Sequence, residues 1–389
     1  MTMKIGLIGA GRLGICLALL IEKAGYEVVA SDTRSDYIRN LQLKKYGGSE
    51  PNVSDLLATA NNISFTVINE RVIDECDVIF TLVATPSLED GSYDVSAVDD
   101  VVSDIQKFGW ENKGSLTGKS LVVGCTTNPG DCDRFQEKLS EVGMNVYYNP
   151  EFIAQGSIVK DLQTADMVLI GGKDDCYDKD QSKDKVWTSA ILEEIYHKIQ
   201  VTEPSIHHMS TKAAELTKIA LNCYLTTKIS YANMIGEVLA LSKMESEIDT
   251  VLKAIGSDSR VGNKYLGFGF GFGGPCFPRD NRAFAAYAKS VGVEYDIGTT
   301  TDNFNNAHAE FVKEYVLYQN HSKLPFCFRY LTYKPGTDIL TESQQYRLCL
   351  DLLDEGCKVY CIDDTLKEQL DERIIFIAAP IEDVYWIDL

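Results

Sequence analysis

A glycine-rich turn near the start of the chain constrains the fold more than any other feature. Residues 4–8 form an apolar segment, and Gly9, Gly11 and Gly14 follow it in GxGxxG spacing before a helical segment. A second apolar segment then ends at Asp32. In a βαβ unit the first glycine makes the tight turn, the second admits a pyrophosphate, and the third lets the helix pack on the strand. The pattern therefore predicts a Rossmann dinucleotide site.

The acid at the end of the second segment predicts which dinucleotide binds. A carboxylate at this place accepts hydrogen bonds from the adenosine ribose and repels a 2′-phosphate. Asp32 therefore favours NAD over NADP, although Arg34, two residues later, is a cation that would work against this preference. The alternative interpretation is a glycine turn in another kind of βαβ unit.

Strand and helix patterns continue to alternate beyond this unit. Apolar segments at 76–86, 120–130, 144–152 and 167–172 predict buried strands. Ligands of open α/β sheets gather at the carboxyl ends of the strands. The polar residues expected at those ends are Thr85, Thr126 and Glu151.

The remainder of the chain predicts two further domains. From about residue 210 to 242 there is no proline, Gly236 is the only glycine, and apolar residues recur at helical spacing, which predicts a long helix. Residues 356–363 resemble residues 25–32, since both enter a strand after a glycine and close it with an aspartate, and the first strand of this last domain is expected at residues 326–333. The predicted fold is α/β, with an N-terminal Rossmann domain (1–205), a central long-helix domain (206–305) and a short Rossmann-like C-terminal domain (306–389).

A second glycine-rich stretch, residues 267–280, contains the strongest candidate for chemistry. Glycines alternate with aromatic residues, and Cys276 follows between two prolines, just before a helical segment that holds Arg279 and Asp280. Backbone N–H groups and the helix dipole at such a place favour a thiolate. A thiol, a carboxylate and a cation behind a glycine loop suggest covalent catalysis. The alternative is a buried structural cysteine after a tight turn.

The composition argues against several classes of protein. The formal net charge of −20 disfavours a nucleic-acid partner. The 11 cysteines are irregularly spaced and lack metal-ligand patterns, so reduced thiols in a cytoplasmic protein without a metal are expected. The longest apolar run, residues 13–21, is too short to span a bilayer and predicts a buried helix.

A series of motifs in order along most of the chain resembles those of the UDP-glucose/GDP-mannose dehydrogenase family. They are GAGRLG with Asp32, VATP at 83–86, CTTNPG at 125–130, NPEFIAQGS at 149–157, AAELTKIALNCYLTTKISYAN at 213–233, SRVG at 259–262, FGFGGPCFPRD at 270–280 and YKPGTDILTES at 333–343. The resemblance implies an enzyme that oxidises the primary alcohol of a nucleotide sugar to a carboxylate with two NAD. UDP-glucose is the expected substrate.

The resemblance also implies catalytic roles. Cys276 would attack the aldehyde intermediate, forming a thiohemiacetal and then a thioester. Lys218 and Asn222 lie four residues apart and so share one helix face. The resemblance implies that they stabilise the oxyanion. Without the resemblance, the expected interpretation is a solvated pair on the surface. The groups implied to handle protons and water are Asp280, Glu151 and Thr126.

Binding roles follow from the same resemblance. The cofactor-binding residues would be Gly9, Gly11, Arg12, Leu13, Gly14, Asp32, Thr85, Thr126, Gln155 and Arg279. The substrate-binding residues would be Glu151, Phe152, Ile153, Lys218, Asn222, Arg260, Tyr265, Gly267, Phe272 and Gly273. The family pairs subunits through the central helix and places the arginine of SRVG in a neighbouring subunit's site, so a homodimer is implied. The C-terminal domain would bind the sugar nucleotide.

Some positions depart from the family pattern. Arg12-Leu13 stands for a usual Tyr-Val pair, Gln155 for a glutamate, Arg279 for a lysine, and Met167 and Thr341 for arginines. With the short C-terminal domain, these leave two alternatives open. One is a single-step dehydrogenase of the hydroxy-acid type, with Cys276 a bystander. The other is a non-catalytic homologue that binds NAD or a nucleotide. Two, one or no NADH per sugar would separate the three.

Overall fold

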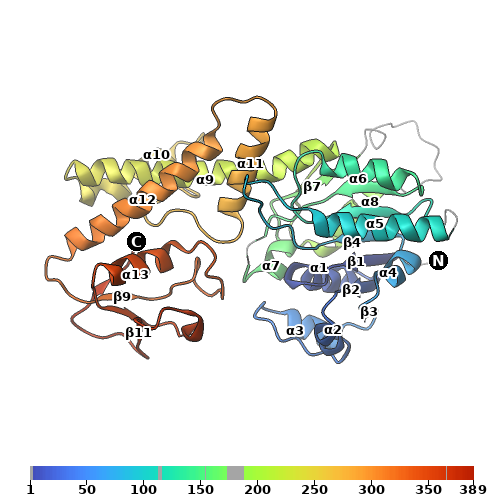
Figure 1. The fold of residues 1–389 in the computed structure, drawn as a ribbon, viewed down its shortest axis with the longest axis horizontal. Helices are drawn as coiled ribbons and strands as arrows, with labels where there is room; N and C mark the ends of the chain where they lie inside the picture. Colours follow the sequence, from blue (N-terminus) through green and yellow to red (C-terminus); the bar gives the residue numbers. More distant parts are fainter. Residues whose placement is uncertain (1–2, 113–115, 154, 173–187, 365) are drawn as a thin grey trace. The chain divides into compact units, whose positions relative to one another are not determined.

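The protein folds into two compact units, residues 1–218 and 219–389. The computed structural model describes residues 3–112, 116–153, 155–172, 188–364 and 366–389. Figure 1 shows their helices and strands coloured along the chain.

The first unit is built on an eight-stranded sheet of order β3-β2-β1-β4-β5-β6-β7-β8. Each neighbouring pair is parallel except β6 and β7, which are antiparallel. The carboxyl ends of the first six strands in this order therefore meet at one edge. The strands are β1 (Lys4–Ile8), β2 (Glu27–Ser31), β3 (Ile63–Thr66), β4 (Val78–Thr81), β5 (Ser120–Val123), β6 (Asn145–Tyr148), β7 (Met167–Gly171) and β8 (Ser205–Met209).

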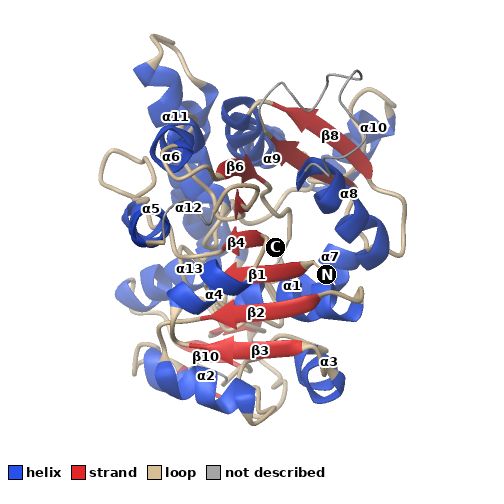
Figure 2. Cartoon of the chain, turned by 90° about the vertical axis from the view of Figure 1, so that its right-hand side faces the viewer, coloured by secondary structure: helices blue, strands red, loops and turns tan. Residues whose placement is uncertain are grey.

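Helices cover both faces of this sheet (Figure 2). On one face lie α1 (Arg12–Lys23), α3 (Val53–Thr59), α7 (Ile158–Gln163) and α8 (Thr188–Ile199), and on the other lie α4 (Asn69–Glu75), α5 (Ser96–Glu111) and α6 (Asp131–Ser140). Helix α2 (Ser35–Gln42) packs beside β3. This is the doubly wound α/β arrangement that the glycine turn predicted, and its ligand site is expected at the carboxyl edge.

Helix α1 confirms the interpretation of the longest apolar run as a buried helix. Every residue from Gly14 to Ile21 is buried. The residues from Ile15 to Ile21 form one cluster with the strand residues Leu7, Ala30 and Phe80. Because the helix is apolar almost all round, it is stable only when it is covered on several sides, here by the sheet and by α3, α7 and α8.

The second unit begins within the long helix α9 (Thr211–Leu241), whose bounds agree with the helix predicted from the sequence. It continues with the short 3₁₀ turn η2 (Glu245–Glu247) and the helices α10 (Ile248–Ser257), α11 (Phe277–Ser290) and α12 (Ile297–Gln319). Asp296 caps α12 by accepting a hydrogen bond from the Thr299 amide at 2.6 Å. Within the residues that the structure describes, no helix has the length and apolar character needed to cross a membrane.

A parallel four-stranded sheet of order β11-β10-β9-β12 ends the chain. Its elements are β9 (Phe326–Phe328), α13 (Gln344–Asp354), β10 (Val359–Cys361), η3 (Lys367–Gln369), β11 (Ile375–Phe376) and β12 (Tyr385–Trp386). This sheet is parallel and smaller than the sheet of the first unit. The strand expected over residues 326–333 ends at Phe328, however. Its partners β10 and β12 are only 3 and 2 residues long, so no ladder extends it to Tyr333.

Gly14→Ala should destabilise the first unit, although alanine is usually the better helix residue. A Cβ atom at Gly14 would lie 2.1 Å from the main-chain oxygen of Gly9, so helix and turn must separate. We expect a loss of about 1–3 kcal/mol in the free energy of unfolding, measured by urea denaturation. Gly47→Ala, where no atom lies within 4 Å of the new Cβ, is the matched control and should stay within about 0.5 kcal/mol of wild type. Equal effects in the two variants would refute the close-packing role.

Candidate active site

The glycine turn after β1 has the geometry that a dinucleotide requires. Gly9 has φ +101°, and a Cβ there would lie 2.6 Å from the Leu82 carbonyl oxygen. The amides of Gly9 and Ala10 both donate to the Ser31 carbonyl at 2.9 Å, which ties the turn to β2. At Gly11 a Cβ would meet only the Arg34 guanidinium, at 3.9 Å. The turn is therefore fixed by its hydrogen bonds to β2, and the open space at Gly11 leaves room for a pyrophosphate beside the N-terminus of α1.

Asp32 follows β2 and is held by Arg34. The Nε and Nη2 atoms of Arg34 donate to the two carboxylate oxygens at 2.8 Å each, and the Arg34 amide donates at 3.0 Å. The guanidinium also lies 4.2 Å from the centre of the Tyr37 ring. Burial opposes ionisation of Asp32, but the bonds from Arg34 outweigh it and lower the pKa of Asp32. The Asp32 carboxylate is thus charged, and its hydrogen bonds with Arg34 fix its orientation.

Two of the predicted site residues, both threonines, lie in the loops that follow the neighbouring strands β4 and β5. Thr85 is buried and Thr126 is partly buried. The loop of Thr126 is held by Glu215 of α9, a residue that is 0% exposed. Its carboxylate accepts from the Thr127 hydroxyl at 2.7 Å and from the amides of Gly130 and Cys132 at 2.6 and 2.9 Å. Burial raises the pKa of Glu215 to about 7, and these donors oppose that rise.

The loop after β6 carries Glu151 and is contacted by Lys218. The Lys218 ammonium donates to the main-chain oxygen of Glu151 at 2.8 Å and lies 4.7 Å from the centre of the Phe152 ring. The Tyr196 hydroxyl lies 2.5 Å from the Glu151 carboxyl oxygen Oε1. Burial raises the pKa of Glu151 to about 7. A carboxyl whose pKa is raised to about 7 therefore lies on a loop that a cation of α9 contacts, an arrangement suited to acid–base chemistry.

Two of the unusual residues contact each other in this unit. Arg12 Nη1, at the start of α1, donates to Gln155 Oε1 at 2.9 Å. The loop beyond Gln155 is held by the buried Glu50, which accepts from the amides of Gly156 and Ile158 at 3.0 and 2.6 Å. At these two positions, where the chain departs from the family pattern, the Arg12 guanidinium donates a hydrogen bond to the neutral amide oxygen of Gln155. Of the other cofactor and substrate candidates here, Leu13 and Ile153 are partly buried and pack against the main core.

In the second unit, α11 brings the predicted thiol and acid together. Cys276 is the exposed residue that immediately precedes α11. The Asp280 amide donates to the Cys276 carbonyl at 2.8 Å, so the two residues stand one helical turn apart. Asp280 is 2% exposed, and Asn222 Nδ2 of α9 donates to its Oδ2 at 2.6 Å. Arg279, between them on the helix, is partly buried.

Side chains from α9 and α12 hold the glycine stretch before Cys276. Asn233 accepts from the Gly269 amide at 3.0 Å, and His308 Nε2 lies 2.7 Å from the Gly269 carbonyl oxygen. Asn305 bonds to both main-chain groups of Phe272, at 2.8 and 2.9 Å. The Phe272 side chain is 3% exposed. The main-chain groups of Gly269 and Phe272 are therefore already bonded within the protein, and the Phe272 ring is buried.

The glycines of this stretch serve mainly to pack the chain against itself. A Cβ at Gly271 would lie 2.2 Å from Asn305 Oδ1, and one at Gly273 would lie 2.3 Å from the Glu342 carbonyl oxygen. At Gly267, by contrast, no atom lies within 4 Å of the new Cβ. Close approach to a ligand is therefore possible at Gly267, whereas the later glycines admit neighbouring protein atoms.

Two substrate candidates lie on the surface. Tyr265 has φ +59° and packs its ring edge against Phe277, with the ring centres 6.1 Å apart. The Arg260 side chain is 87% exposed and donates to both carboxylate oxygens of Asp258 at 3.0 and 2.7 Å. Arg260 therefore extends into solvent with its charge intact.

The structure therefore places the predicted residues in two contact groups. The first unit contains Lys218 with Glu151 and Phe152, and the second contains Asn222 with Asp280 and the adjoining Cys276. Sequence reasoning missed the supporting residues Asn149, Tyr196, Glu215, Asn233, Asn305 and His308. Asn149, Glu215 and Asn233 lie inside the recognised motifs, so their polarity was a usable signal. Tyr196 and the α12 residues carried none.

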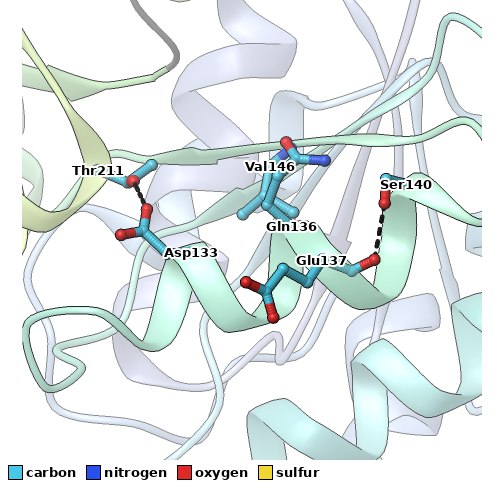
Figure 3. A pocket seen from close by; sticks show the side chains of 6 residues that line it. All are labelled: Asp133, Gln136, Glu137, Ser140, Val146 and Thr211. Carbon is cyan, nitrogen blue, oxygen red and sulfur yellow. Dashed lines mark hydrogen bonds between the residues drawn. The ribbon is translucent and has the colours of Figure 1, made fainter.

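Figure 3 shows a surface pocket of the first unit that takes no part in these groups. Its volume is about 280 Å³, and it is lined by Asp133, Gln136, Glu137, Ser140, Val146 and Thr211. The Thr211 hydroxyl donates to Asp133 at 2.5 Å. None of the predicted site residues lines it, and we assign it no role.

Comparison with known proteins identifies the family. The sequence model described as the UDP-glucose/GDP-mannose dehydrogenase family, NAD binding domain, matches residues 3–200, and the model of the family's central domain matches residues 212–307. The chain belongs to this family. The expected family, the α/β fold class and NAD as the cofactor are thereby confirmed.

Relatives support the assignment along nearly the whole chain. A protein named putative UDP-glucose 6-dehydrogenase from Bacillus subtilis is 29% identical over 96% of this chain and 84% of its own length. The solved UDP-glucose dehydrogenase of Pyrobaculum islandicum is 26% identical, with a TM-score of 0.83 over 98% of this chain and 87% of that one. A UDP-D-ManNAc dehydrogenase from Pyrococcus horikoshii, 20% identical with a TM-score of 0.74 over 92% and 83% of the two chains, shares the fold.

The Asp32–Arg34 pair leads to a prediction on cofactor choice. In Asp32→Ala, Arg34 loses its partner and can meet a 2′-phosphate, so we expect kcat/KM for NADP relative to NAD to rise about 10-fold or more. The measurement is steady-state kinetics with each cofactor. The double variant Asp32→Ala/Arg34→Ala is the matched control, because it lacks the cation and should not gain NADP use. If both variants change the ratio alike, Arg34 has no part in the discrimination.

Proposed function

We propose that this protein oxidises the primary alcohol of a nucleotide sugar to a carboxylate in two NAD-dependent steps, with UDP-glucose as the substrate. The observation that carries the proposal is Cys276, an exposed thiol directly before α11, one turn from an Asp280 that is bonded to Asn222. The other cysteines that the structure describes are buried or partly buried. The names of the relatives support UDP-glucose as the sugar nucleotide.

In the first step the alcohol would give a proton to Asp280 and a hydride to NAD. Gly9, Gly11, Gly14 and Asp32 would hold NAD, which supplies the hydride acceptor for both oxidations. The Lys218 ammonium would stabilise the alkoxide, because a fixed positive charge beside developing negative charge lowers the barrier. Asn222 has a second amide N–H besides the one given to Asp280, and in this proposal it would donate to the same oxygen.

In the second step Cys276 makes the aldehyde oxidisable again. Its thiolate forms a C–S bond with the aldehyde carbon, and the carbonyl oxygen becomes the alkoxide of a thiohemiacetal. Hydride loss from that carbon gives a thioester. Water, positioned by Thr126, then attacks while Glu151 takes its proton, and the C–S bond breaks to release the carboxylate. Each turnover would consume one water and two NAD.

The proposed division of labour follows the domains expected from the sequence. Residues 1–205 would bind NAD, 206–305 would carry dimerisation and catalysis, and 306–389 would bind the sugar nucleotide. Thr341 is exposed where the family has an arginine, and the exposed Arg329 is bonded to Asp388 at 2.9 Å. A weaker hold on the nucleotide than on NAD is the expected consequence.

A homodimer is proposed on the surface of α9. Its exposed apolar residues recur three, four and seven positions apart, a spacing that puts them on one face of the helix. They are Tyr224, Tyr231, Met234, Val238 and Leu241, exposed by 58%, 43%, 41%, 54% and 76%. A contiguous apolar stripe on a soluble helix is typical of an association surface.

Cys276→Ser tests the covalent step. A serine hydroxyl is a far weaker nucleophile at neutral pH, so release of free acid should fall about 100-fold or more while the first oxidation persists. NADH formed per sugar nucleotide consumed, read at 340 nm alongside chromatography of the products, should fall from two towards one. Cys357→Ser, at a partly buried cysteine of the C-terminal sheet region, is the control and should keep two.

The same experiment separates the alternatives. One NADH per sugar in wild type would indicate a single-step dehydrogenase, and none with any nucleotide sugar would indicate a binding protein. Free acid released by Cys276→Ser at the wild-type rate would rule out the thioester.

Val238→Glu tests the dimer. A carboxylate in the middle of the stripe would be buried unpaired, so we expect the dissociation constant of the dimer to rise about 100-fold or more in sedimentation velocity. Trp110→Glu, an exposed aromatic residue of α5 outside the stripe, is the control and should leave the association unchanged. A monomeric wild-type protein at micromolar concentration would contradict the proposal.

A further inference from the structure

The hydroxyl of Tyr196 lies between two oxygen atoms that both require a proton from a neighbour. Asn149 Oδ1 is 2.7 Å from it and Glu151 Oε1 is 2.5 Å from it. A tyrosine hydroxyl has a single proton to donate. Only one of the two oxygens can receive that proton, so the other contact needs a proton from elsewhere.

The orientation of Asn149 decides which oxygen receives it. Asn149 is 1% exposed, and its Nδ2 donates to the Leu169 carbonyl of β7 at 2.9 Å. A flipped amide would place its oxygen against that carbonyl, so the observed orientation is the one with a satisfied network. Asn149 Oδ1 can then only accept, and the Tyr196 proton is committed to it. With that proton committed to Asn149, we infer that the 2.5 Å contact between Tyr196 and Glu151 is satisfied by a proton on the Glu151 oxygen.

We propose that Glu151 is protonated in the resting protein and that Tyr196 and Asn149 are positioning residues that keep it so. Two hydrogen bonds form this proton chain: the Glu151 acid donates to the Tyr196 oxygen, and the Tyr196 hydroxyl donates to the Asn149 side-chain carbonyl. Its catalytic meaning rests on the proposed function, in which Glu151 takes a proton from water. Glu151 can then act as a base only in molecules whose Glu151 proton has been released to solvent.

The surrounding charges are consistent with a neutral acid. Burial raises the pKa of Glu151 to about 7. Burial also raises the pKa of Tyr196 well above its usual value, so Tyr196 keeps its hydroxyl proton and is not a tyrosinate. Among the described residues of the first unit, the titratable groups that face Glu151 are Tyr196 of α8 and Lys218 of α9. Lys218 lowers the pKa of Glu151 by its charge, but its ammonium bonds to the main-chain oxygen and leaves the carboxyl to Tyr196.

Infrared titration of the whole protein tests the proton directly. At pH 6 the wild-type spectrum should contain the C=O band of a protonated carboxyl that is absent from Glu151→Gln, and this band should disappear with a midpoint near pH 7. Glu151→Gln is a suitable reference because its amide also donates to the Tyr196 oxygen. Absence of such a band at pH 6 overturns the proposal without any further variant.

Asn149→Leu tests the positioning roles. Without the Asn149 carbonyl, the Tyr196 proton is free to stabilise the Glu151 carboxylate, so the midpoint should fall by about one pH unit or more. The acidic limb of the rate of aldehyde oxidation to the acid should move down with it. Tyr148→Phe is the matched control, because the neighbouring Tyr148 hydroxyl is buried without a partner among the described residues, and its loss should leave the midpoint in place.

The outcomes separate the two proposals. An Asn149→Leu midpoint that stays or rises, in a protein whose urea unfolding is cooperative, shows that Tyr196 donates to Glu151 and overturns the positioning roles. The expected infrared shifts in a protein that forms no NADH with any nucleotide sugar would support the proton chain and overturn the proposed function.

Discussion

The parallel pairing of β2, β1, β4, β5 and β6 is the constraint on which the first unit depends. Parallel strands end at the same edge, so the glycine turn, Asp32, Thr85, Thr126 and Glu151 all follow strand ends that are neighbours in the sheet. The register that produces this comes from ordinary core packing of short apolar strands buried on both faces. The site residues thus need no special fold of their own, and variation at that edge alters the ligand without altering the core.

Helix α9 carries polar groups at regular intervals. Glu215, Lys218 and Asn222 are spaced by three and four residues and therefore lie on one face of the helix. Each makes a specific bond: Glu215 to the loop of Thr127, Lys218 to the main chain of Glu151, and Asn222 to Asp280. A buried carboxylate, a cation and an amide on one helical face are costly unless all are satisfied, and each of them is.

The sequence predicted the fold class because the fold class depends on local patterns, and the proposed site residues were chosen from the same patterns. GxGxxG spacing, strand-end acids and a helix start after Cys276 are local, and the structure has each where expected. The shorter strand β9 was mispredicted because its length is set by partners more than thirty residues away. Tyr196 could not be found either, since its bonds to Asn149 and Glu151 span 47 and 45 residues and leave no trace in local spacing.

The spacing along α9 also limits how genes of this kind can change in length. One residue inserted between Lys218 and Asn222 would turn the rest of the helix by about 100° and advance it by about 1.5 Å. Asn222 would leave the face that it shares with Glu215 and Lys218, and the exposed apolar stripe beyond it would rotate by the same angle. Single insertions and deletions should therefore be absent from this stretch of the gene, while loops at the helix ends remain free to vary in length.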